Sequence, residues 1–112
     1  MLFRSRSAGW PARPDAPFRR RPMNPRTAAA VARMLDHAVL KPEYAAADLA
    51  RHAAMCVDRG VGCICVRSCD VAAAARLVAG SPVVVASVIA FPHGAQPAAV
   101  KALEAQIGRA HV

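Results

Sequence analysis

Four cysteines are the residues of this 112-residue chain whose type first suggests chemistry, and they stand at positions 56, 63, 65 and 69. Structural zinc sites draw on two pairs of ligands at turn-compatible spacing, typically Cys-x-x-Cys. Cys63 and Cys65 instead lie two apart in an apolar, strand-like run, so both sulfurs point to one face of a strand. Because no secretory signal precedes them, we expect reduced thiols and no metal site.

The sequence pattern predicts alternating strands and helices, and these secondary-structure elements position the cysteines and the other candidate residues. Leu49, Ala53 and Cys56 recur at helical spacing, and Gly60 follows them as a natural stop. Residues 83–90 are mostly apolar and rich in β-branched side chains, as expected for a strand that is buried on both faces of a sheet. The expected order is a short helix at 27–33, strands at 34–40, 61–66 and 83–90, and helices at 45–59, at 70–79 and from 97 through 103.

Strand–helix repeats at this spacing predict a parallel sheet with right-handed crossovers. Two architectures fit, a doubly wound sheet and a (β/α)₈ barrel. Neither a Gly-x-Gly-x-x-Gly motif nor a Walker-type loop is present, which weakens a nucleotide-binding interpretation. In both architectures the functional side chains gather in the loops that follow the strands, and the polar and unusual residues of this chain fall there.

Three segments of the chain carry a family pattern. Residues 35–42 read Leu-Asp-His-Ala-Val-Leu-Lys-Pro, and residues 63–66 read Cys-Ile-Cys-Val. Residues 88–94 read Val-Ile-Ala-Phe-Pro-His-Gly and are followed by Val-Lys-Ala-Leu-Glu-Ala at 100–105. In order and spacing these segments resemble the first three strands and the third helix of the deoxyribose-phosphate aldolase family. The resemblance, over about residues 31–105, implies an α/β fold made of the first three βα units of a (β/α)₈ TIM barrel, incomplete in this chain.

The resemblance implies class I aldolase chemistry, the cleavage of 2-deoxy-D-ribose 5-phosphate to D-glyceraldehyde 3-phosphate and acetaldehyde. A lysine of such an enzyme forms a Schiff base with the substrate carbonyl, and the protonated imine withdraws electrons from the bond that breaks. A second lysine and an aspartate tune the nucleophile and move protons. No metal and no cofactor is implied. In the family these three groups lie on the fourth strand and beyond, so we expect no catalytic residue in this chain and no activity of the chain alone.

Asp36 and Cys65 are the two site residues that the resemblance implies, both as lining of the substrate pocket. Asp36 matches a polar residue at the end of the first strand, facing the site. The alternative for Asp36 is a carboxylate that holds neighbouring backbone amides. Cys65 matches a family cysteine that points into the barrel near the substrate. Its alternative is a small, buried, apolar thiol.

Lys41 and His93 are weaker candidates for the site. Lys41 as a stand-in Schiff-base lysine would need desolvation or a neighbouring cation to lower its pKa, whereas the nearby Glu43 favours the charged form. His93 lies in the turn after the third strand and could face a ligand, or could be bonded to the backbone of that turn.

The chain departs from the family pattern at several positions. Ala38 stands where the family often has Thr, and Ala45 stands where a Thr commonly caps the helix, a loss of about 1 kcal/mol. Arg67-Ser68 replaces an Asn-Pro-like pair after the second strand. On the third helix, Lys101 and Glu104 are three residues apart, which predicts a weak surface ion pair.

The basic character of the chain is concentrated in one segment. Of the net charge of +8, residues 1–26 carry +6, from seven Arg and one Asp, and they also hold five of the nine prolines. We interpret this segment as a disordered Arg/Pro-rich extension, either upstream of a true start at Met23 or acting as an electrostatic arm for nucleic acid or anionic lipid. A further alternative is an organelle transit peptide, which is Arg-rich and poor in acids, although the segment shows no clear amphipathic period. The arm is the basis of the alternative function, a non-catalytic interaction or nucleic-acid-binding module.

The last residues differ from the rest. Ile-Gly-Arg-Ala-His-Val at 107–112 matches the translation of a common sequencing adapter (ATC GGA AGA GCA CAC GTC), and Gln106 fits the same frame. We therefore expect three segments: the extension at 1–26, the amino-terminal part of an aldolase-type barrel at 27–105, and an artefactual tail at 106–112. The alternative for the tail is a genuine helix end with a basic residue.

The expected partners follow from composition and from the resemblance. No run of about 18 strongly apolar residues occurs, so we expect no membrane-spanning helix. The reduced thiols favour the cytoplasm. The family resemblance implies a small sugar phosphate as ligand of the complete protein. Nucleic acid is disfavoured, because the folded part is nearly neutral, and a homo-oligomer is left open.

Overall fold

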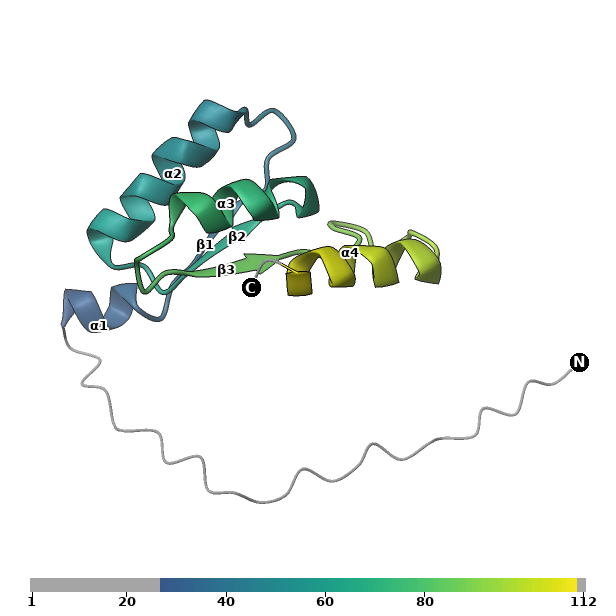
Figure 1. The fold of residues 1–112 in the computed structure, drawn as a ribbon. Helices are drawn as coiled ribbons and strands as arrows, with labels where there is room; N and C mark the ends of the chain where they lie inside the picture. Colours follow the sequence, from purple (N-terminus) through teal and green to yellow (C-terminus); the bar gives the residue numbers. More distant parts are fainter. Residues whose placement is uncertain (1–26, 111–112) are drawn as a thin grey trace, which may run out of the picture.

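The computed structural model describes residues 27–110, in which helices and parallel strands alternate (Figure 1). The extension expected at 1–26 lies outside the described residues. In chain order the elements are α1 (Ala28–Ala32), β1 (Asp36–Val39), α2 (Ala46–Arg59), β2 (Cys63–Val66), the 3₁₀ turn η1 (Ser68–Asp70), α3 (Val71–Leu77), β3 (Val84–Ser87) and α4 (Ala98–Ala110). The three expected strand–helix units are therefore confirmed.

The three strands form one parallel sheet in the order β1-β2-β3. Asp36 pairs with Cys63, and Cys63 pairs with Val84, and the register continues residue by residue to the other end of each strand. Because paired residues of parallel strands lie on the same face, the register divides the sheet into two faces with alternating rows of side chains. Each ladder is four residues long, shorter than the runs that the sequence predicts.

Helices α2 and α3 cover one face of the sheet (Figure 1). Ile64 and Val66 of β2 belong to this face, and both side chains are fully buried. They pack with Leu49, Ala53 and Cys56 of α2, the helical stripe that the sequence predicts. The core consists of Val39, Leu49, Ala53, Cys56, Val61, Ile64, Val66, Val71, Ala74, Val78, Val83 and Val85.

The opposite face carries the other two rows, Asp36–Cys63–Val84 and Ala38–Cys65–Ala86. Asp36 and Ala38 are exposed there, and Val84 is 55% exposed. The expectation that the third strand is buried on both faces is thus wrong for the described residues. β3 is an edge strand, and α2 and α3 cover only the other side of the sheet.

Helix α2 begins and ends close to the expected residues. Ala45 precedes it in an extended conformation and supplies no side-chain cap. Asp48 instead accepts a hydrogen bond from the Ala45 N–H at 2.9 Å, which satisfies one donor of the first turn. This bond and the neighbouring Arg51 hold the pKa of Asp48 below its usual value. At the other end Gly60 adopts the left-handed conformation that terminates the helix.

Gly62, the residue before β2, packs closely against the carboxyl end of the entry helix α1. Its N–H donates to the carbonyl of Ala32 at 3.0 Å. A Cβ at this position would overlap the backbone carbonyl of Arg33, so the close approach of these two segments requires glycine. Within residues 27–110, no helix combines the length and the apolar character that a bilayer crossing requires.

Candidate functional site

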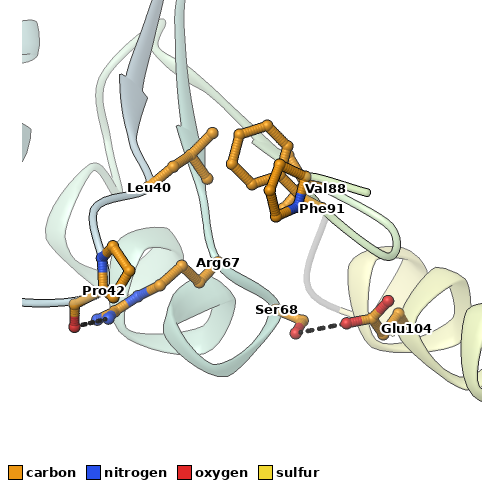
Figure 2. A pocket seen from close by; sticks show the side chains of 8 residues that line it. Leu40, Pro42, Arg67, Ser68, Val88, Phe91 and Glu104 are labelled. Carbon is orange, nitrogen blue, oxygen red and sulfur yellow. Dashed lines mark hydrogen bonds between the residues drawn. The ribbon is translucent and has the colours of Figure 1, made fainter. Parts of the chain in front are cut away.

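A cavity of about 430 Å³ lies at the carboxyl ends of the three strands (Figure 2). We call it the strand-end cavity. All three strands contribute the residues that follow them, and α4 contributes one side chain. The lining consists of Leu40, Pro42, Arg67, Ser68, Val88, Phe91, Pro92 and Glu104. In parallel α/β folds this edge of the sheet is where ligands and reacting groups gather.

The cavity wall is mostly apolar, with three polar side chains. Leu40 directly follows β1, Val88 directly follows β3, and Phe91 lies in the turn after it (Figure 2). Phe91 is 54% exposed, so its ring covers one side of the opening rather than filling the core. An apolar wall with few polar groups is typical of sites for small organic ligands.

Glu104 braces α4 against two loops of the cavity. Its Oε1 accepts a hydrogen bond from the Ser68 hydroxyl at 3.3 Å, and its Oε2 accepts one from the Ala90 N–H at 2.7 Å. Ala90 is buried and has a φ of 56°, a left-handed conformation that costs a non-glycine residue about 1 kcal/mol. Both carboxylate oxygens are engaged, so Glu104 serves as a brace in this arrangement and not as a free base.

Lys101 forms no ion pair with Glu104 within residues 27–110, so the predicted surface pair is wrong. The tertiary partners Ser68 and Ala90 take the carboxylate instead. Sequence spacing on one helix favours neighbours three residues apart, but hydrogen bonds from a backbone N–H and a hydroxyl outweigh a solvent-exposed pair.

Among the residues that the structure describes, Arg67 is the one cationic side chain that lines the strand-end cavity. Its Nε donates to Asp70 Oδ2 at 2.6 Å, and its Nη atoms donate to backbone carbonyls of the loop after β1. The hydrogen bond to Asp70 is the main cause of a raised pKa of Arg67, so the guanidinium keeps its charge. In the sequence, Arg67 stands out only as a departure from the family pattern.

Asp36 and Cys65 do not line the strand-end cavity. Asp36 is the first residue of β1, paired with Cys63 at the amino ends of the strands. The ladder begins at Asp36 and runs to Val39, so Asp36 lies at the amino end of β1, and its role in lining a substrate pocket stays a prediction. Both residues lie on the sheet face opposite α2 and α3, where Cys65 is 9% exposed.

The thiols on this face are held in their neutral form. Burial first, and then the neighbouring Asp36 carboxylate, raise the pKa of Cys63 to about 11. The same two causes raise the pKa of Cys65. The thiolate is the nucleophile and the metal ligand, so neither residue is activated for chemistry near neutral pH. In residues 27–110 no three His, Cys, Asp or Glu side chains are grouped as a metal site would require.

The two weaker candidates also lie apart from the cavity lining. Lys41 is exposed, with its Nζ 5.6 Å from the centroid of the Tyr44 ring. Its surroundings do not supply the desolvation that a Schiff-base lysine needs. His93 is exposed in the turn after β3. Leu40, Arg67 and Val88 of the wall could have been found from one signal, their position directly after a strand, whereas Glu104 lies within α4 and carries no such signal.

The comparisons with known proteins agree with this geometry. No family model matches the chain. It is 44% identical over 81 residues to a deoxyribose-phosphate aldolase of Mycolicibacterium paratuberculosis, a match that covers 72% of this chain and 35% of that protein. A solved structure from Coccidioides immitis, provisionally assigned to the same enzymes, superposes with a TM-score of 0.72 at 25% identity, over 76% of this chain and 34% of that one.

A third relative is the tetrameric deoxyribose phosphate aldolase of Aeropyrum pernix, with a TM-score of 0.68 and 27% identity over 72% of this chain and 35% of that one. The chain thus spans about a third of the length of the proteins it matches. Sequence identity and the parallel strand–helix arrangement point to the same enzymes. The chain belongs to the deoxyribose-phosphate aldolase family.

Proposed function

We propose that residues 27–105 form the amino-terminal part of a class I aldolase that cleaves 2-deoxy-D-ribose 5-phosphate to D-glyceraldehyde 3-phosphate and acetaldehyde. The observation that carries this proposal is the strand-end cavity, which opens at the carboxyl ends of three parallel strands in a chain of this family. That edge is the catalytic edge of (β/α)₈ barrels.

The role of this chain in the proposed reaction is to supply part of the wall of the substrate pocket. Leu40, Val88 and Phe91 supply apolar surface that excludes water from the substrate. Dry surroundings strengthen the polar interactions of the reacting groups. Glu104 and Arg67 are already engaged in hydrogen bonds, so the described lining residues include no free carboxylate or amine that could act as acid or base.

The lysine that forms the Schiff base comes from elsewhere in the enzyme under this proposal. The chain has two lysines, and neither lines the strand-end cavity. Lys41 is exposed and Lys101 lies on α4. We therefore expect the 112-residue chain alone to be inactive.

A chimera tests the proposal. Residues 27–105 replace the matched segment of the Mycolicibacterium paratuberculosis relative, to which the chain is 44% identical. A functional wall predicts acetaldehyde release from 2-deoxyribose 5-phosphate within about tenfold of the parent rate, because a misplaced wall costs about a hundredfold. A chimera that folds, as judged by circular dichroism and gel filtration, yet cleaves no substrate would contradict the proposal.

Borohydride trapping tests the second part. The chain alone is incubated with the substrate and sodium borohydride, which reduces an imine to a stable amine adduct. We expect no adduct at Lys41 or Lys101 by peptide mass spectrometry, and an adduct on a lysine of the parent segment in the chimera. A substrate-dependent adduct on either lysine of the chain would overturn the expectation of inactivity.

The location and assembly of the enzyme are part of the same proposal. The four cysteines are free, which agrees with a reducing compartment, and we place the enzyme in the cytoplasm. A homo-oligomer is expected by analogy with the tetrameric Aeropyrum pernix relative. Sedimentation of the active chimera beside its parent measures this directly.

A further inference from the structure

We propose that Arg67 is a positioning residue that fixes one wall of the strand-end cavity, by holding the loop after β1 against the loop after β2. The proposal rests on the proposed function only in taking this cavity as the substrate site. The role belongs to this chain's own sequence, because Arg67 stands where the family pattern has an Asn-Pro-like pair.

The contacts of the guanidinium all reach the two loops. Nη1 donates to the carbonyl of Pro42 at 3.1 Å and more weakly to that of Lys41 at 3.5 Å. Nη2 donates to the carbonyl of Tyr44 at 3.0 Å. In the described part of the chain, every hydrogen bond between residues 41–44 and residues 67–70 is donated by this one side chain.

The loop after β1 depends on such an external donor. Pro42 has no N–H, so it cannot close a backbone hydrogen bond of its own. Within the loop, the Tyr44 N–H donates to the Lys41 carbonyl at 3.2 Å, one turn bond for four residues. Leu40 and Pro42 form the cavity wall on this side (Figure 2), so the position of the wall follows the position of the loop.

The geometry requires arginine. A guanidinium presents five donors in a rigid, planar fork, whereas an ammonium is a compact point charge. Asp70 holds the Nε side of the fork at 2.6 Å and thereby aims the Nη side at the loop carbonyls. A lysine could reach one of these partners but could not bridge Asp70, Pro42 and Tyr44 together.

The opposite side of the cavity has its own attachment. Ser68, the next residue, donates to Glu104 of α4, which also accepts from the Ala90 N–H. Figure 2 shows the two attachments on either side of the cavity, Arg67 to Pro42 and Ser68 to Glu104. Removal of Arg67 therefore releases the β1 side and leaves the α4 side in place.

The experiment compares Arg67→Met with Arg51→Met in the full 112-residue chain. Arg51 also pairs with a carboxylate three residues away, Asp48, but it is exposed on α2 and bridges no loops. Amide hydrogen exchange is followed at Tyr44, and methyl NMR shifts at Leu40 and Val88. We expect Arg67→Met to speed amide exchange at Tyr44 about tenfold and to shift the Leu40 methyl resonances, while the Val88 methyl resonances stay unchanged. In Arg51→Met we expect the exchange rate at Tyr44 and the methyl shifts of Leu40 and Val88 all to stay unchanged.

Arg67→Lys tests whether the planar guanidinium itself is required. It also replaces Arg67→Met in the experiment if Arg67→Met does not fold. It keeps the charge and most of the length, and we expect a several-fold faster exchange at Tyr44. Unchanged exchange at Tyr44 in either variant overturns the proposal, as does an acceleration that is equal at Tyr44 and at the core amides, which would report global unfolding. The readout involves no catalysis, so an inactive chimera with an intact Arg67 effect would refute the proposed function alone.

Discussion

His37 of β1 and His52 of α2 share a hydrogen bond, with 2.9 Å between Nε2 of the first ring and Nδ1 of the second. The two ring centroids are 5.0 Å apart, and the Tyr44 ring lies 5.2 Å from that of His52. One nitrogen of the pair must donate and the other accept, so a doubly protonated pair cannot keep the bond. The pair thus couples the first strand to the helix that covers it.

Stability should fall in mild acid because of this pair. Burial first, and then the charges of His37 and Arg51, lower the pKa of His52 from 6.5 in spite of Asp48 nearby. The unfolded chain therefore binds more protons than the folded chain below pH 6.5. The contribution is fully present above that pH and is lost as the pH falls toward the folded-state value. Urea midpoints between pH 5 and 8 should decline more steeply for the unmodified chain than for His52→Gln.

His93→Gln is the matched control, since His93 is exposed in a turn. It should leave the pH dependence of the urea midpoint unchanged. If His52→Gln keeps the same slope as the unmodified chain, the pair does not contribute to the pH dependence.

Removal of the Glu104 brace should weaken the attachment of α4. Glu104→Ala leaves the Ser68 hydroxyl and the Ala90 N–H without their acceptor, and the loss of two hydrogen bonds to a charged group should cost about 2–3 kcal/mol of unfolding free energy. Glu104→Gln keeps a carbonyl oxygen for Ala90 and should cost about 1 kcal/mol or less. Urea unfolding measures both, and equal costs would argue against the brace.

Gly62→Ala should be among the most damaging single-methyl additions. The new Cβ would overlap the Arg33 carbonyl, which is backbone and cannot move without shifting the connection between α1 and β1. We expect a loss of about 2 kcal/mol or more in unfolding free energy. Gly108→Ala is the control: it lies in α4 with open space around a new Cβ, and it should gain up to about 1 kcal/mol. Similar effects at both positions would contradict the close approach.

Thiol alkylation should distinguish the four cysteines. Cys69 is exposed and should react first with iodoacetamide at pH 8, followed slowly by the others. With a pKa of about 11, Cys63 has a thiolate fraction on the order of one in a thousand at that pH. Asp36→Asn removes a carboxylate that raises this pKa, so Cys63 should react several-fold faster. Peptide mass spectrometry follows the alkylation of each cysteine. An unchanged alkylation rate of Cys63 in Asp36→Asn would show that Asp36 does not raise the pKa of this thiol.

Local signals predicted the fold well. The apolar stripe through Leu49, Ala53 and Cys56 placed α2, and Gly60 placed its end, because both depend on neighbours along one helix. The length of β3 was overestimated for a tertiary reason. Ser87 pairs with Val66, the last residue of β2, so Val88 and the residues after it have no ladder partner and turn toward the cavity.

The cavity was harder to predict, because its polar contacts join residues that are distant in sequence. Arg67 reaches a loop more than twenty residues earlier, and Glu104 reaches Ser68, thirty-six residues away. No spacing rule on one helix or strand contains such partners. The prediction of Asp36 and Cys65 as site residues rests on a motif match alone. The ladder register places both on the face opposite α2 and α3, and neither lines the strand-end cavity.

Because Arg67 and Ser68 are adjacent, the length of the loop that holds them matters as much as the identity of its residues. Two neighbouring residues reach in opposite directions, one to the loop after β1 and the other to α4. Surface loops usually accept insertions and deletions at little cost. Here one extra residue between the two side chains would leave only one of them aligned with its partner, so variation among natural sequences should be restricted to replacements at this point, without changes in loop length.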